Sequence, residues 1–445
     1  MEFSDRQKIL FIAVSSLAIH IVAIIFLTHL GDSEYWPRIM GSVNSGNDIY
    51  GLDGNYYTPI WGYLLSSLDI IIQGIGNIPL FENMFDVFLP WNDVPGLKPF
   101  ITTPGINFVT KFPLAVCDII VGYMIYKIVA EFTDSRKGII AMVLWCFCPM
   151  VIYMSSVQGQ FDTISTLLAL LTIKLLREDH AFFAGVSFGL SVWLKLFPSV
   201  CILLFVGYLL MKHGKGVAYK HIALAAAGAL LISVVIFLPQ ATHGELNYAF
   251  GFLTSRLHSS SYPDWFAPIN TIRTVLMGLL TVALMIWSFI GIRNKRDERY
   301  LYLYAGVLIA VATIISRGYQ YVPSFIPFIL LFYMISYDNR SYKGLFIWIS
   351  VLTVIDAFFS VGTSVFSITS VYYGLIDPAF LEEITVAFLT SIGHPSATPI
   401  GVVFAVIWAI MLWLFVLFGF VDLSDNRYPR IAKISEKLRF GRSEQ

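Results

Sequence analysis

Long apolar runs, separated by shorter polar segments, recur along most of the chain. The first run begins just after Lys8, continues to Leu30, and contains no Asp, Glu, Lys or Arg. A helix needs about 20 mainly apolar residues to cross a bilayer, whereas a transmembrane barrel shows short alternating segments. The runs therefore predict membrane-spanning helices at residues 9–30, 108–130, 138–156, 161–176, 181–197, 199–211, 219–238, 269–292, 300–316, 321–336, 344–366 and 400–422.

The pattern predicts an all-α integral membrane protein with about 12 transmembrane helices, in a range of about 10–13. Several runs are shorter than a full crossing. Two of them are joined directly at Pro198, which is typical of a shallow hairpin; these are residues 181–197 and 199–211. The segment 367–392 either adds or removes a span. Composition agrees, because 13% of the residues are charged, against about 25% in soluble domains. A soluble globular protein is excluded.

Lysine and arginine are unequally distributed between the predicted loops. Most of the 29 Lys and Arg residues fall in loops on the same side of the membrane as the N-terminus. Cytoplasmic loops carry an excess of positive charge, so both termini are predicted to be cytoplasmic. No small-residue cleavage site follows the first run, which indicates a retained span. The net charge of zero is the sum over two membrane faces that differ in charge, so it says nothing about nucleic acid, and no nucleic-acid partner is expected.

The predicted outward loops are long and the inward loops are short. We expect one polytopic domain over residues 1–422, with a large extracytoplasmic loop at 31–107, and a basic cytoplasmic tail at 423–445. Within the large loop, Pro59 opens a segment with apolar residues at helical spacing, which predicts a helix lying in the membrane interface. Trp61 is expected to anchor at that interface. Because functional residues concentrate in loops, the chemistry is predicted on the outer side.

Charged side chains inside a bilayer cost a few kcal/mol each, so each one needs an explanation. Asp32 and Glu34 follow the first run in "GDSEYW", and Lys111 lies near the start of the second run. Lys195 and Arg317 lie at the outer ends of their runs. A carboxylate can act as a general base, and cations can stabilise a phosphate leaving group. Together these charges indicate a reaction with a lipid phosphate at the outer face.

Ordinary structural explanations remain open for these charges. Lys195 and Arg317 can extend to lipid headgroups. Asp162 opens a run, where the helix dipole favours a negative charge, and Asp118 can pair with a neighbouring helix. The four cysteines lie in apolar runs without metal-ligand spacing. We expect no metal ion and no cofactor.

Five segments, in this order, resemble motifs of the GT-C superfamily, whose members use polyprenyl-phosphate sugars. The likeness extends over roughly residues 30–335 and is nearest to the branch of polyprenyl-phosphomannose-dependent mannosyltransferases. The paired-acid motif of some members is replaced by "DSE". The segments are "GDSEYW" with "YYTPIW", "TKFPLAVCDII", "SSVQGQFDTIS", "SVWLKLFPSV" and "RGYQYVPSF".

The resemblance implies an inverting transfer of a hexose, with mannose favoured, from a polyprenyl or dolichyl phosphate to a hydroxyl group. The acceptor would be a glycolipid, a lipid-linked oligosaccharide or a protein. Asp32 and Glu34 compete for the role of catalytic base, and the donor phosphate would contact Lys195, Arg317 and Lys111. The remaining substrate contacts are expected from Tyr35, Tyr50, Tyr57, Gln160, Asp162, Gln320 and Tyr321.

Two other classes of membrane protein remain open. A transporter or lipid flippase also places charges within helices, although it favours a charged path to the cytoplasmic side and paired broken helices. A non-catalytic scaffold would tolerate replacement of Asp32. We favour the enzyme, in a prokaryotic plasma membrane, or in the endoplasmic reticulum if the source is eukaryotic.

Overall fold

The computed structural model describes most of the chain and divides it into two compact units. It describes residues 4–30, 32–45, 50, 57–79, 82–91, 99–248, 250–251, 267–314, 319–337, 340–391 and 399–424. Unit 1 comprises Met1–Thr163 and Phe346–Leu412, and unit 2 comprises Ile164–Leu345 and Trp413–Gln445. Arg317 and almost all of the predicted 423–445 tail lie outside the described residues. The single-domain expectation stays a prediction.

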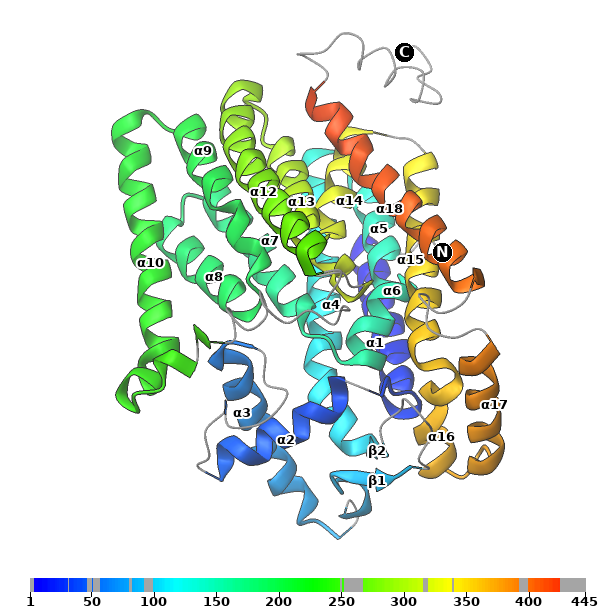
Figure 1. The fold of residues 1–445 in the computed structure, drawn as a ribbon. Helices are drawn as coiled ribbons and strands as arrows, with labels where there is room; N and C mark the ends of the chain where they lie inside the picture. The colour runs from blue at the N-terminus through cyan, green and yellow to red at the C-terminus, as the bar shows by residue number, and fades with distance from the viewer. Residues whose placement is uncertain are drawn as a thin grey trace. The chain divides into compact units, whose positions relative to one another are not determined.

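Unit 1 is built around three long helices that lie side by side: α1, α4 and α5 (Figure 1). Local sequence explains where two of them begin. Ser4 and Gln7 form a reciprocal capping box before α1, and the Asp134 side chain accepts from the Lys137 amide before α5. The helices of this unit are α1 (Asp5–Phe26), α4 (Pro104–Phe132), α5 (Ser135–Cys146), α6 (Pro149–Ile152), the π-helix η3 (Tyr153–Gln158), α15 (Arg340–Val361), η7 (Gly362–Phe366), α16 (Ser367–Val371) and α17 (Pro378–Ser391); α15 starts in unit 2.

The described parts of the segment that follows α1 form short elements. In addition to the helix predicted at Pro59, the structure has a helix that begins at Asp32. It also has a small antiparallel pair of strands in which Leu89 faces Ile101. Three-residue strands are too short to show an alternating pattern, so the strand pair was not predicted from the sequence. Whether the Pro59 helix lies in the interface stays a prediction. The elements are α2 (Asp32–Asn44), α3 (Pro59–Gly76), η2 (Glu82–Met84), β1 (Phe88–Pro90) and β2 (Phe100–Thr102).

Unit 2 is also helical, and its helices pack through small residues. A Cβ atom added at Gly185 of α8 would lie 1.9 Å from the Ala225 carbonyl oxygen of α10, so these two backbones touch. Helices in membranes commonly associate in this way. The helices of unit 2 are α7 (Asp162–Arg177), α8 (Ala181–Leu194), η4 (Phe197–Cys201), α9 (Ile202–Lys212), α10 (Lys215–Thr242), α12 (Ala267–Lys295), α13 (Arg299–Ile314), η6 (Tyr319–Ser324) and α14 (Ile326–Ser336); α7 starts in unit 1, and α18 (Pro399–Ser424) is shared between the units.

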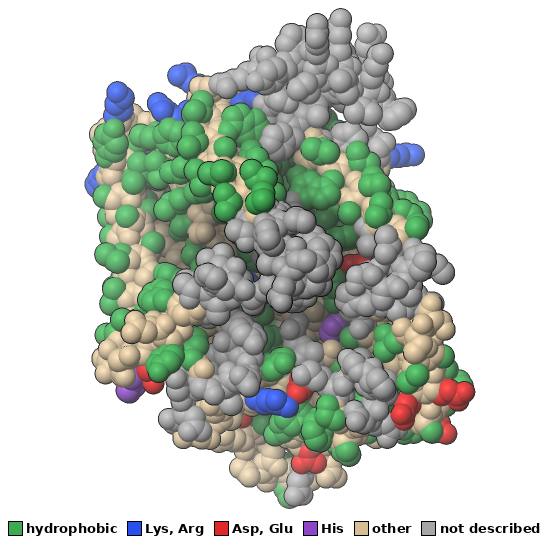
Figure 2. Space-filling model, in the orientation of Figure 1, with side chains coloured by type: hydrophobic (Ala, Val, Ile, Leu, Met, Phe, Trp, Pro, Cys, Tyr) green, Lys and Arg blue, Asp and Glu red, His purple; other side chains and the backbone are tan. Residues whose placement is uncertain are grey.

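The membrane character predicted from the sequence is confirmed, whereas the number of spans is not. Each predicted span overlaps one or more of the described helices. Within the described residues, five helices are long and apolar enough to cross a membrane, or six if the broken helix α5–α6–η3, bent by 46°, counts as one span. Figure 2 shows hydrophobic side chains covering α10 and α12, where Leu231, Val235 and Leu279 are among those exposed. These surfaces are suited to lipid.

Candidate functional site

A buried lysine lies at the centre of unit 1, where α4 passes the π-helix η3. Lys111 is completely buried, and its Nζ donates to the Val157 carbonyl at 2.8 Å and to Thr28 Oγ1 at 3.4 Å. The last carbonyls of a helix carry partial negative charge, which favours a cation there. Lys111 therefore connects α4 to the segment just after α1 and to the end of η3.

The "GQFD" motif lies on the turn that follows η3. Gly159 has a φ of 76°, and the Gln160 amide donates to the Met154 carbonyl at 2.8 Å. The left-handed conformation favours glycine because it has no Cβ. A π-helix is rare and occurs frequently at functional sites. Gln160 and Asp162, both predicted to contact substrate, are buried on this turn.

An aromatic cluster holds the helices α2 and α3 against the same turn. The Trp36 indole donates to the Gly159 carbonyl at 3.2 Å, and the Trp61 ring stacks on Phe161 with centroids 4.1 Å apart. Tyr57 meets the Phe161 ring edge-on at 4.9 Å. Trp61, expected at the membrane interface, is instead 98% shielded within the protein, because Phe161 and Trp36 cover it.

The two candidate acids lie at the start of α2. Asp32 is the first residue of the helix, and its side chain lies outside the described residues. Glu34 is buried, and its Oε1 accepts from Arg38 Nη2 at 2.6 Å one helical turn later. Tyr35 and Tyr50 are half-buried. One of the two competing carboxylates is thus already engaged with a cation.

Asp118, on α4, forms the interhelical contact expected from its structural interpretation. Its carboxylate accepts a hydrogen bond from the Thr163 hydroxyl near the start of α7. Its backbone carbonyl accepts from the Trp145 indole at 3.1 Å. Asp118 therefore holds the beginning of α7, and with it the "GQFD" turn, against α4 and α5.

Unit 2 brings together a second set of predicted residues. Lys195 ends α8 and is buried, with Nζ 5.5 Å from the centroid of the Tyr321 ring. Tyr321 also packs edge-on against Phe197 at 5.0 Å. Gln320 is half-buried in the same turn η6. The Lys195 side chain is thus covered by protein, although the sequence left an extension to lipid headgroups open.

Two buried histidines near η3 were missed by the sequence interpretation. His20 Nδ1 lies 2.6 Å from Ser156 Oγ, and His29 Nδ1 lies 3.0 Å from the Tyr153 hydroxyl. A histidine inside an apolar run was the available signal, but it does not reveal a partner more than a hundred residues away.

Substitution of Gly159 by alanine is expected to lower the free energy of unfolding by about 1–3 kcal/mol. The φ of 76° is unfavourable for alanine, and the added Cβ would lie 3.2 Å from Lys111 Cε and 3.3 Å from Trp36 Nε1. Thermal unfolding in detergent, followed by tryptophan fluorescence, measures the change. Gly278→Ala is the matched control: no atom lies within 4 Å of its added Cβ in α12, so equal or higher stability is expected. Equal stability of both variants would contradict the assigned turn.

Sequence comparisons place this chain near known glycosyltransferases. The model of glycosyltransferase family 87 matches residues 114–267. The chain is 23% identical over 230 residues to GPI mannosyltransferase 1 of Kluyveromyces lactis, covering 51% of this chain and 48% of that protein. It is 23% identical over 141 residues to the Saccharomyces cerevisiae protein of the same name, covering 32% and 35% respectively. The chain thus spans about half the length of the K. lactis relative and about a third of the length of the S. cerevisiae relative.

Among solved structures, the oligosaccharyltransferase of Archaeoglobus fulgidus is similar over 89% of this chain and 56% of its own, with 15% identity and a TM-score of 0.39. The family match and the relatives confirm the predicted resemblance to GT-C-type glycosyltransferases of the mannosyltransferase kind. The matched segment contains Asp118, Gln160, Asp162 and Lys195, whereas α2 lies outside it.

Proposed function

We propose that this protein transfers a hexose, with mannose favoured, from a polyprenyl or dolichyl phosphate to a hydroxyl acceptor on the extracytoplasmic face of a membrane. The turn at Gly159 gives this proposal its main structural support. It lies within the segment similar to glycosyltransferase family 87, and Trp36 of the acid-bearing helix α2 donates to its carbonyl. The GPI mannosyltransferase relatives favour mannose as the sugar.

Asp32 is the proposed catalytic base. It precedes Trp36 by four residues in α2, and residues spaced in this way share one helix face. Glu34 is paired with Arg38 and buried, which supports assigning it a positioning role rather than proton transfer. The acceptor oxygen would attack the anomeric carbon as Asp32 takes its proton, giving inverted configuration.

The leaving group is the lipid phosphate, which receives the electron pair of the broken bond between the anomeric carbon and oxygen. Lys195 and Arg317 are the proposed cations that stabilise its charge. Lys111 is hydrogen-bonded to Val157 and Thr28, which supports a role in positioning the nearby turn at Gly159. The expectation that no metal takes part in this step stays a prediction.

A donor comparison tests the proposed reaction. The full-length protein is reconstituted in liposomes with a membrane-lipid extract as acceptor, and labelled polyprenyl-phosphate mannose, polyprenyl-phosphate glucose and GDP-mannose are offered separately. Transfer is expected from polyprenyl-phosphate mannose and not from GDP-mannose. Transfer from GDP-mannose alone would overturn the lipid-phosphate donor, and faster transfer from the glucose donor would overturn the preference for mannose.

A further inference from the structure

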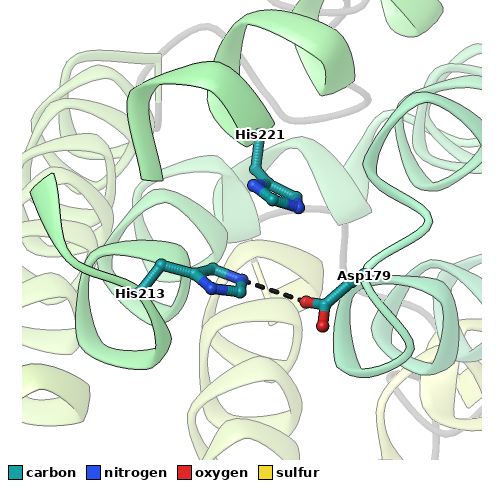
Figure 3. A group of neighbouring side chains, drawn as sticks. All are labelled: Asp179, His213 and His221. Carbon is teal, nitrogen blue, oxygen red and sulfur yellow. Dashed lines mark ion pairs between the residues drawn. The ribbon is translucent and has the colours of Figure 1, made fainter. Parts of the chain in front are cut away.

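Three side chains with metal-ligating atoms lie together in unit 2, outside the residues assigned to sugar transfer. Asp179 lies in the turn between α7 and α8, His213 follows the end of α9, and His221 lies in the second turn of α10 (Figure 3). Asp179 and Lys195 flank opposite ends of the 14-residue helix α8. That helix is about 21 Å long at 1.5 Å per residue, so the cluster is separate from the proposed phosphate site.

The three side chains converge on one region between the two turns. One ligand atom from each lies within 4.8 Å of those of the other two. His213 Nε2 is 3.0 Å from Asp179 Oδ1, and the rings of His213 and His221 stack with centroids 4.5 Å apart. Both histidines are half-buried and Asp179 is exposed. Figure 3 shows the two rings and the carboxylate facing the same space.

The hydrogen bond of His221 prepares it as a ligand. Its Nδ1 lies 2.9 Å from the Val217 carbonyl oxygen, which can only accept a hydrogen bond. Nδ1 therefore carries the proton, and the lone pair of the neutral ring lies on Nε2. Metal-bound histidines commonly make this contact through the nitrogen that does not bind the metal.

The Asp179 carboxylate is held in place by a hydrogen bond. Asp179 has a φ of 64°, and its Oδ1 accepts from Lys212 Nζ at 2.7 Å. Lys212 also donates to the Leu176 and Arg177 carbonyls, so it keeps partners if a cation takes its place at the carboxylate.

We propose that Asp179, His213 and His221 bind a divalent transition-metal ion, with Zn²⁺ as the cation that suits them best. Two imidazoles and one carboxylate form a usual zinc ligand set, with water in the fourth position. Zn–N and Zn–O distances of about 2.0–2.2 Å require the ligand atoms to approach by roughly 1 Å, which rotation of exposed and half-buried side chains allows. The ion would tie the turn before α8 to the turn before α10.

Cobalt and zinc binding to the full-length, tag-free protein in detergent tests the site after treatment with EDTA. One Co²⁺ per chain is expected, with the visible absorption of a tetrahedral ion that Zn²⁺ then abolishes. The double variant His213→Ala/His221→Ala is expected to bind at least about 10-fold more weakly. His180→Ala, which removes an exposed histidine next to Asp179, is the matched control and should bind as the wild type does.

Absence of stoichiometric Co²⁺ or Zn²⁺ binding by the wild-type protein would overturn the site. Equal binding by the wild type and the double variant would also overturn it. Asp179→Asn provides a second variant should the double variant unfold, because asparagine tolerates a positive φ; it too is expected to bind more weakly. These measurements do not depend on sugar transfer, so their outcome is separable from that of the proposed function.

Discussion

Replacement of Asp32 by asparagine is expected to lower the rate of sugar transfer by about 10²–10⁴-fold, because the amide cannot accept the proton of the attacking hydroxyl group. The substitution preserves the size of the side chain at the first residue of α2, so the fold should be retained. Initial rates of transfer from labelled polyprenyl-phosphate mannose, measured in liposomes at equal protein content, give the effect.

Glu34→Gln is the matched comparison for this experiment. Glu34 lies two residues further along α2 and is paired with Arg38, so its replacement should weaken the helix and reduce transfer much less than Asp32→Asn does. The reverse order, with transfer lost in Glu34→Gln and retained in Asp32→Asn, would assign the base to Glu34. Equal, undiminished rates in both variants would remove both acids from the mechanism.

Substitution of Gly185 by valine is expected to lower the free energy of unfolding by about 3 kcal/mol. The Cβ would lie 1.9 Å from the Ala225 carbonyl oxygen, and this neighbour is backbone, which can move only if α8 and α10 separate. A Cβ added at Gly228 of α10 would likewise lie 2.2 Å from the Phe182 carbonyl oxygen of α8. Equilibrium unfolding in a denaturing detergent, followed by circular dichroism, measures the loss.

Gly278→Val in α12 separates close packing from the general cost of valine in a helix. No atom lies within 4 Å of the Cβ built at Gly278, so only a small change in stability is expected. Similar losses in Gly185→Val and Gly278→Val would show that the contact between α8 and α10 contributes little. An unchanged stability in Gly185→Val would contradict the packing directly.

The sequence predicted the long helical elements well, because a long apolar run is a local signal. The predicted span at 9–30 corresponds to α1 at Asp5–Phe26, whose start depends on the capping residues Ser4 and Gln7. The predicted span at 138–156 is broken into α5, α6 and η3, bent by 46°. Pro149 marks this break in the sequence, but the π-helix after it depends on contacts with other helices, including Lys111 at its end.

The candidate site was predictable as a set of residues but not as an arrangement. The motifs indicated Lys111, Gln160 and Asp162, which the structure places at or beside one buried turn. The contact from Trp36 to Gly159 joins residues 123 positions apart. No local pattern reports a contact of that kind, and a tryptophan near a membrane helix is equally typical of an interface anchor.

The fate of a doubly labelled donor tests directly whether the protein breaks the bond between the sugar and the lipid phosphate. Polyprenyl-phosphate mannose, labelled in both the phosphate and the sugar, is offered to sealed liposomes that contain the wild-type protein and acceptor lipids. The two labels are expected to separate, with free lipid phosphate released in equal amount to the mannose transferred, and Asp32→Asn is expected to prevent the separation. Movement of the intact donor across the bilayer, with both labels still joined, would contradict sugar transfer and identify a flippase.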